Sequence, residues 1–470
     1  MNNLTSTDKS KSRGTVPRAI TVLVCLLGAT VYFLPAPEGA DAGVMKAAGI
    51  VVFAIGLWAT AVLPEFFTAI IFFLLAVTIG GSAPRTVFAG FHSTAGWMVF
   101  GGLIIGFAVE TTGLGATISR RLQRYFGKTY LSILAGIIVV GALMAFLVPS
   151  NVARIMILIP IFGAFADRLG FVQGSNGRAA IVLAASAGTF YPGFGILPAA
   201  VPNLILLGAA ESIHDIHLTY GRYFLLNFPV IGAVSIIALP FVIRTLFPDQ
   251  PTVSKSDGVH EAPDIKRRTL SIVLLIALGL WITDYFHGVS PAWIALGAAI
   301  YCLLPWVGVL PATALVERVN LGPWLFIVGV IGMGSVVASS GLGDLIGERL
   351  FAVLRLEIGD HARNFAAVSA MGMVLGMVAT FVGQPAIMTA LASNIVDATG
   401  WPLMTAVLAQ IPSWSMALFP YELPALVLAM NLGGIRMGQL VRLMVAMSLL
   451  FWIVVLPLQF LWWRFLGMFG

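Results

Sequence analysis

Residues 131–170, LSILAGIIVVGALMAFLVPSNVARIMILIPIFGAFADRLG, are apolar on both sides of Pro149-Ser150-Asn151. A proline inside an apolar run interrupts a helix, and a serine directly after it is a preferred helix cap. We therefore predict two half-helices that enter and leave the bilayer on the same face as a re-entrant hairpin, over about 131–170. Non-helical backbone at this depth is tolerated where it is buried in protein or lines a cavity.

The composition of the chain indicates a protein that lies in a lipid bilayer. Of the 470 residues, 59% are hydrophobic and only 10% are charged, whereas soluble domains carry roughly 25% charged residues. Apolar stretches near the ~20 residues that cross a bilayer recur from end to end. The first of them, residues 19–36, is followed directly by others, so we expect a retained helix and not a signal peptide. The fold class is an all-α polytopic membrane protein.

The remaining composition excludes several function classes. Cys25 and Cys302 both lie in apolar runs, so neither a disulfide framework nor a thiolate metal site is expected. The formal charge of +6 comes from short basic clusters between apolar runs, which membrane topology explains better than nucleic-acid binding. His-Glu-x-x-His, Gly-x-Ser-x-Gly and Walker-type motifs are absent from the sequence, which argues against an enzyme or an ATP-driven pump.

The domain boundaries follow from charge and from breaks in the apolar runs. A basic N-terminal tail before a loop with Glu38 and Asp41 predicts a cytoplasmic N-terminus by the positive-inside rule. The predicted order is a cytoplasmic tail (1–18), a first transmembrane helix with its outer loop (19–43), a first repeat (44–247) with a broken helix at about 179–210, a cytoplasmic linker (248–268), and a second repeat (269–470) with a hairpin at about 366–398 and a broken helix at about 402–434.

Two segments of the chain that match each other support the assignment of two repeats. Trp97, followed by Thr112-Gly113-Leu114-Gly115, has an ordered counterpart in Trp324, followed by Ser340-Gly341-Leu342-Gly343. The loop after the first copy is basic, whereas acidic residues offset the arginines in the loop after the second copy. We therefore expect the two repeats to be inverted in the membrane.

Inverted repeats with hairpins and broken helices place non-helical backbone near the middle of the bilayer. Half-helix N-termini there offer N–H groups and a positive dipole end to an anion, and carbonyls at the opposite ends can hold a cation. The predicted binding site lies between the tips and the breaks of both repeats. Its residues are Ser150, Asn151, Val152, Arg154, Gly195, Pro198, Gly383, Gln384, Pro385 and Pro424. Spacing alone would put the second tip nearer Thr380.

Two charged residues fall inside these segments. Arg154 follows the first hairpin break, where a cation opposes the helix dipole. It could bind a substrate carboxylate, stand in for a coupling cation as a fixed positive charge, or pair with internal carbonyls or a carboxylate. Glu422 lies in the second broken helix and could carry a coupling proton or form an ion pair, with Arg154 as a candidate partner.

The layout resembles the divalent anion:sodium symporter family. Ser150-Asn151-Val152 stands where the family carries Ser-Asn-Thr, and Gly195-Ile196-Leu197-Pro198-Ala199 stands where it carries a Gly-Thr-Pro-Pro-Asn-like run. The resemblance implies about eleven transmembrane helices in two inverted repeats, usually in a homodimer. It also implies an elevator-type mechanism, in which a transport domain moves against a scaffold domain to carry di- or tricarboxylates or sulfate.

This chain departs from the family motifs where side-chain oxygens are expected. Val152 replaces the tip threonine, Ala199 replaces an asparagine, and Leu423-Pro424-Ala425-Leu426 lacks the second proline-asparagine run. Sodium, the one cofactor that the resemblance implies, would be held by Ser150, Asn151 and Gly195. Exchange and proton coupling are the alternatives to sodium.

We therefore expect an integral protein of the bacterial inner membrane whose partners are a small anionic substrate, the lipid bilayer and a second copy of itself. A monocarboxylate carrier of a related fold is the nearest rival, because one arginine and few hydroxyls suit a smaller anion. An anion channel is the other alternative.

Overall fold

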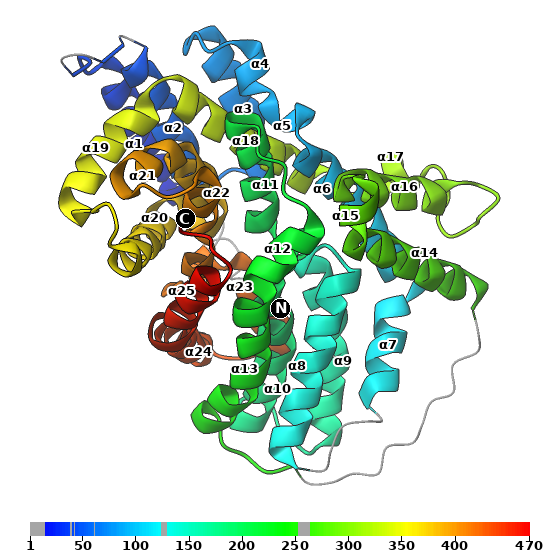
Figure 1. Cartoon of the computed structure of the whole chain (residues 1–470). Coiled ribbons are helices and arrows are strands. Elements are labelled where there is room, and N and C mark those ends of the chain that lie inside the picture. Colours follow the sequence, from blue (N-terminus) through cyan, green and yellow to red (C-terminus); the bar gives the residue numbers. More distant parts are fainter. Residues whose placement is uncertain (1–14, 38–39, 42, 61, 124–128, 252–263) are drawn as a thin grey trace, which may run out of the picture.

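The computed structural model describes residues 15–37, 40–41, 43–60, 62–123, 129–251 and 264–470. Helices without strands build this part of the chain (Figure 1). Five stretches are long and apolar enough to cross a membrane, namely Thr94–Thr112, Tyr130–Leu147, Tyr220–Leu246, Gly322–Ser339 and Met437–Phe465. Shorter apolar helices accompany them, and the count of eleven crossings stays a prediction.

The chain begins with helices that pack on one another in sequence order. They are α1 (Thr15–Phe33), α2 (Val44–Thr60), α3 (Glu65–Thr78), the short α4 (Pro84–Val87) and α5 (Ala89–His92), α6 (Thr94–Thr112) and α7 (Leu114–Gln123). The N-terminal tail before Thr15 and the basic residues Arg124 and Lys128 lie outside the described residues.

Residues 131–170, the predicted first hairpin, belong to two helices with a break between them. α8 (Tyr130–Leu147) ends before Pro149, and α9 (Asn151–Arg168) begins directly after Ser150. The hydroxyl Oγ of Ser150 accepts a hydrogen bond from the Ala153 N–H at 3.3 Å, which satisfies one of the free donors of the first turn. The hairpin tip is therefore a capped helix start.

The first broken helix follows. α10 (Asn176–Phe190) leads into the short turns η1 (Pro192–Gly195) and η2 (Leu197–Ala199), and α11 (Val201–His214) continues beyond them. α12 (Tyr220–Asn227), η3 (Phe228–Gly232) and α13 (Ala233–Leu246) complete this half of the chain. In Figure 1, α8, α9, α10 and α13 lie together at one end of the molecule, and the contacts between them agree.

The second half of the chain is also entirely helical among the described residues. α14 (Ile265–Ile282), α15 (Asp284–His287), α16 (Pro291–Leu303) and α17 (Ala314–Glu317) precede α18 (Gly322–Ser339), α19 (Leu342–Leu354), α20 (His361–Ala390) and α21 (Ala392–Thr399). The second broken helix comprises α22 (Leu403–Leu408), η4 (Ile411–Ser415), η5 (Pro420–Glu422) and α23 (Pro424–Gly433). It is followed by α24 (Met437–Leu450), η6 (Phe451–Val455) and α25 (Leu456–Phe465). Most of the predicted linker, 252–263, lies outside the described residues.

The second hairpin differs from the prediction, which placed its tip at Gly383-Gln384-Pro385. These residues are helical and belong to α20. The Gln384 amide nitrogen nevertheless lies 2.7 Å from the point that a Cβ on Gly372 would occupy. Twelve residues of a straight helix span about 18 Å, so α20 folds back on itself between Gly376 and Gln384.

The segments that match between the two halves each contain a glycine with a positive φ angle. Gly113 (φ 67°) joins α6 to α7, and Gly341 (φ 76°) joins α18 to α19, both in the left-handed region that favours glycine. Their counterpart tryptophans, Trp97 and Trp324, contact each other with ring centroids 6.5 Å apart. These two matched tryptophans thus lie side by side.

Candidate functional site

A cavity of about 410 Å³ lies at the first hairpin tip. Residues from α6, α9, α11, α18 and α23 line it, together with Phe381 of α20 and the loop before α18. The tip residues Ser150, Asn151 and Val152 all face this cavity, and the Val152 side chain is 52% exposed. Three of the predicted site residues therefore lie together at this cavity.

Three helices begin at this cavity. Asn151 opens α9, Val201 opens α11, and Pro424 opens α23, and all three residues line the cavity wall. The N-terminus of a helix carries unpaired N–H groups and a partial positive charge. Three such ends border one space, and each favours a negatively charged group placed next to it.

Arg154 lies behind the hairpin tip and does not line the cavity. Its side chain is fully buried, and its guanidinium donates hydrogen bonds to the Val148 carbonyl and to the Asn151 side-chain oxygen. It also reaches the first broken helix, where it donates to the carbonyls of Thr189 at 3.3 Å and Ala199 at 2.8 Å. Of the roles considered for Arg154, carbonyl pairing is the one that these contacts show.

Other carbonyls of the first broken helix also accept hydrogen bonds from side chains. The Asn203 amide donates to the carbonyls of Gly193 at 3.0 Å and Ile196 at 2.8 Å. The Tyr223 hydroxyl donates to the Phe194 carbonyl at 2.8 Å. Buried backbone polar groups require such partners, so these side chains hold the unwound segment in one shape.

Glu422 lies in the second broken helix and is 2% exposed. One of its carboxylate oxygens accepts the backbone N–H groups of Leu418 at 3.1 Å and Phe419 at 2.8 Å. The described residues contain no ion pair between Glu422 and Arg154, so the hypothesis of a direct pair is wrong. The other carboxylate oxygen faces Gly376, where the Gln384 amide oxygen also lies.

Gly195 and Gln384, two further predicted site residues, contact other parts of the protein and do not line the cavity. Gly195 packs against the backbone of Phe228, where a Cβ would lie 2.8 Å from the Phe228 Cα. Gln384 donates to the Ser413 hydroxyl at 2.6 Å. Of the ten predicted substrate-binding positions, the cavity lining contains Ser150, Asn151, Val152 and Pro424, whereas Arg154, Gly195, Pro198, Gly383, Gln384 and Pro385 lie outside it.

Sequence reasoning missed the polar residues that approach the cavity from the other helices. Glu65, Glu110, Arg318 and Asn320 line it, as do the aromatic side chains Phe107, Phe326 and Phe381. The glutamates and the arginine lie at or near the ends of apolar stretches, where charged residues are ordinary flanks of a membrane helix. Only the folded chain shows that they share one space.

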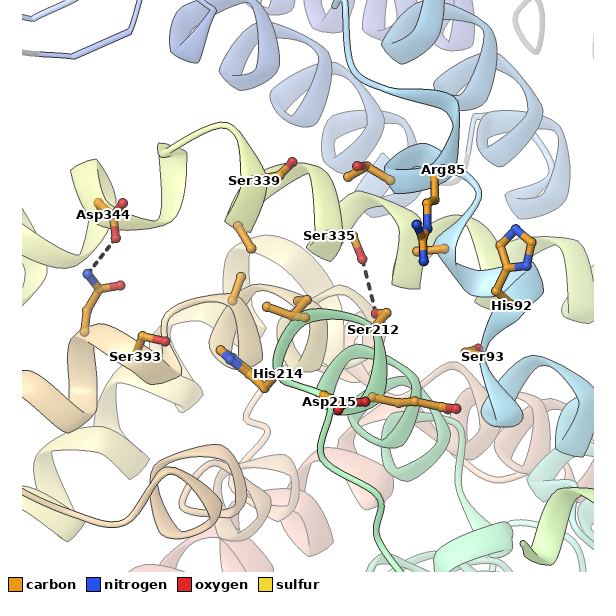
Figure 2. Close-up of a pocket in the computed structure, with 17 residues that line it drawn as sticks. Arg85, His92, Ser93, Ser212, His214, Asp215, Ser335, Ser339, Asp344 and Ser393 are labelled. Atoms are coloured by element: carbon orange, nitrogen blue, oxygen red, sulfur yellow. Dashed lines mark hydrogen bonds between the residues drawn. The ribbon is translucent and has the colours of Figure 1, made fainter.

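A second, larger cavity of about 1210 Å³ has a polar lining (Figure 2). Figure 2 shows Arg85 and His92 on one side of it, His214 and Asp215 at the end of α11, and Ser335 and Ser339 on α18. The Ser212 and Ser335 hydroxyls are 3.2 Å apart and join α11 to α18 across this cavity.

The two cavities touch the same pair of helices at different places. Val201 of α11 lines the smaller cavity, and the last turn of α11, Glu211–His214, lines the larger one. Between them, Gly208 packs so closely on α18 that a Cβ would lie 2.5 Å from the Ile331 side chain. The contact between α11 and α18 therefore closes the space between the two cavities.

A polar contact also ties α11 to α6 at the larger cavity. One carboxylate oxygen of Glu211 accepts hydrogen bonds from the Thr94 backbone N–H at 2.8 Å and from the Thr94 hydroxyl at 2.7 Å. Thr94 is the first residue of α6, so Glu211 supplies an acidic partner to that helix start.

Comparison with known proteins agrees with this architecture. The chain matches the sodium:sulfate symporter transmembrane region over residues 16–469. It belongs to this family, the divalent anion:sodium symporters. Inner membrane protein YbhI of Escherichia coli is 25% identical over 411 residues, which are 79% of this symporter-family chain and 84% of YbhI.

Two further comparisons bear on substrate and fold. The citrate/succinate antiporter of Escherichia coli is 30% identical over 215 residues, which are 41% of this chain and 42% of the antiporter. The structure of the Alcanivorax borkumensis YdaH transporter superposes with a TM-score of 0.55 at 17% identity and covers 96% of this chain and 98% of that one. The chain is therefore a membrane transporter of the symporter family and not an enzyme, and the YdaH structure has the same overall fold.

Proposed function

We propose that this protein is a secondary active transporter of a small carboxylate anion, with di- and tricarboxylates, or a sulfate-like oxyanion, as the first candidates. The observation that carries the proposal is the convergence of the N-termini of α9, α11 and α23 on one cavity. The name of the citrate/succinate antiporter, a relative over two fifths of the chain, supports carboxylates.

The proposed movement is of the elevator type. α11 and α20 belong to the part that carries the hairpin tips, and α6 and α18 belong to the part against which it moves. Tight glycine contacts support sliding along this boundary, because small residues let helices pack closely without interlocking side chains. Gly208 against Ile331 and Gly334 against Ala386 are such contacts. A homodimer in the inner membrane with a cytoplasmic N-terminus completes the proposal.

Coupling by proton or by exchange is part of the same proposal. Glu422 is a buried carboxyl group of the second repeat and lies beside Gln384 at the fold-back of α20. A buried carboxyl group without a cationic partner is a natural proton carrier in a transporter. Exchange of one carboxylate for another needs no proton-carrying group. The name of the related citrate/succinate antiporter describes such an exchange for that protein.

A monocarboxylate with an apolar body is a second candidate, and the cavity wall favours it. Val152, Met156, Phe107, Phe326 and Phe381 supply apolar surface between the helix N-termini and the polar residues Arg318 and Asn320. Such a lining holds a hydrocarbon chain or ring better than it holds a second carboxylate, which loses hydration without gaining a partner.

A ligand-stability screen tests the proposal directly. The purified protein in detergent is heated with succinate, citrate, sulfate, benzoate and hexanoate, and a ligand that binds the folded state raises the melting temperature by mass action. Stabilisation by at least one carboxylate, followed by its saturable uptake into proteoliposomes, is the expected result. If no anion on this panel shifts the melting temperature or enters the vesicles, the proposal is wrong.

A further inference from the structure

The surroundings of Arg154 are unusual for a buried charge, because they contain oxygen atoms but no carboxylate. Four oxygens accept hydrogen bonds from its two terminal nitrogens: the carbonyls of Val148, Thr189 and Ala199 and the side-chain oxygen of Asn151. Arg154 forms no ion pair with an acidic residue among the described parts of the chain. A charge buried in a membrane protein is costly unless it has compensating partners.

The compensation comes from helix ends and unwound backbone. Val148 closes α8, and Thr189 lies in the last turn of α10, so both carbonyls belong to the negative ends of their helices. Ala199 ends the unwound segment η2. Carbonyls at half-helix ends and breaks are the groups that hold monovalent cations in transporters with this type of construction. The position of the guanidinium is therefore that of a bound cation.

The family name implies a sodium ion, and the first repeat does not fit one in addition to Arg154. Asn151 is one of the predicted sodium ligands, and its side-chain oxygen already accepts a hydrogen bond from the guanidinium. Ser150 uses its hydroxyl to cap α9, and Gly195 packs on Phe228. A second cation among the same neutral oxygens would be repelled at short range.

We infer that Arg154 is a built-in counter-ion that occupies the cation position of the first repeat, so that anion binding at the hairpin tip needs no dissolved sodium ion there. This rests on the proposed function. Arg154 acts through Asn151, which it holds by a hydrogen bond and which itself lines the cavity. It is thus a positioning residue and does not touch the substrate.

The first test compares the wild-type protein in two buffers. The dissociation constant of the carboxylate that stabilises the protein is measured in sodium chloride and in an equal concentration of N-methyl-D-glucamine chloride. The inference requires the same affinity in both buffers. Binding that disappears without sodium would overturn it, while the proposed function would stand.

The second test removes the guanidinium. In sodium-free buffer, Arg154→Met keeps the length of the side chain but not its charge, and should weaken anion binding by about ten- to a hundredfold, the effect of losing charged hydrogen bonds. Arg154→Ala leaves space among the same oxygens, so added sodium or guanidinium ions should restore part of the affinity. Arg222→Met, at an exposed arginine on α12, is the matched control and should bind as the wild type.

Arg154→Lys keeps the test decisive if the uncharged variants do not fold. A lysine retains the charge with fewer donors, so this variant should bind the anion in sodium-free buffer with an affinity between those of the wild type and Arg154→Met. If Arg154→Met folds and binds as tightly as the wild type, or if Arg154→Lys folds but binds only with sodium, the inference is wrong. If the wild type binds no carboxylate in either buffer, the proposed function fails instead.

Discussion

Val152 shows how one substitution at the hairpin tip changes the chemistry of the cavity. Its side chain is half-exposed in the cavity beside Ser150 and Asn151. The valine presents methyl groups at a position where a threonine would present a hydroxyl of nearly the same volume. The side chain therefore presents an apolar surface to whatever occupies the cavity.

Val152→Thr should raise the affinity for succinate by several-fold, because a new neutral hydrogen bond contributes about 0.5–1.5 kcal/mol. The dissociation constant, measured by ligand-dependent melting or calorimetry, checks this. Val172→Thr is the matched control, because Val172 is 71% exposed and does not line the cavity. An equal gain in both variants would mean that the position at the tip has no special role.

Glu422 offers a second test at the residue scale. Glu422→Gln keeps the oxygen that accepts the N–H groups of Leu418 and Phe419, so the variant should fold with little loss of stability. It cannot release a proton, so a proton-coupled transporter would lose the pH dependence of its transport rate. Uptake into proteoliposomes over a series of pH values measures this. A Gln variant whose rate keeps the pH profile of the wild type would exclude Glu422 as the coupling group.

At the scale of elements, the contacts of α11 decide how the two cavities are separated. Its first residue touches the smaller cavity, its last turn touches the larger one, and Gly208 packs on α18 between them. Glu211 binds the start of α6, and Ser212 pairs with Ser335 of α18. In the proposed elevator movement, α11 would have to release these two polar contacts.

Glu211→Ala should therefore make the larger cavity more accessible, because α11 loses both hydrogen bonds to Thr94. The measurement is the labelling rate of a single cysteine at Ala338, which lines this cavity, in a background without Cys25 and Cys302. Asp215→Ala is the control, because Asp215 lines the same cavity but pairs with His217 of its own loop. Equal labelling rates in the two variants would contradict the role given to Glu211.

The second hairpin shows the limit of local sequence signals at the same scale. The first tip was predictable because Pro149 and Ser150 end one helix and start the next. Gly383-Gln384-Pro385 gives a similar local signal, yet α20 folds back earlier, between Gly376 and Gln384. The position of that turn depends on tertiary contacts of Gln384 with Gly372 and Ser413, which the sequence does not reveal.

For the whole molecule, the sequence predicted the all-helical membrane architecture, the family and the helix break at Pro149-Ser150. Apolar runs and their interruptions are local properties, so composition and proline positions were sufficient for these predictions. The sequence could not show which way Arg154 points, because three of its four acceptors come from elements other than its own helix. It also could not show that Glu65, Glu110 and Arg318 meet the hairpin tip, since those residues come together only in the folded chain.

The fixed position of Arg154 has a consequence for the energetics of the transport cycle. A charge that belongs to the protein goes out and comes back with it, so it adds nothing to the net current of a complete cycle. In transport without proton coupling, only the charge of the substrate then contributes to the net charge moved per cycle, at about 2.3 kcal/mol per elementary charge for each 100 mV. Exchange of one dicarboxylate for another would be electrically silent, and the two substrate pools alone would set its direction.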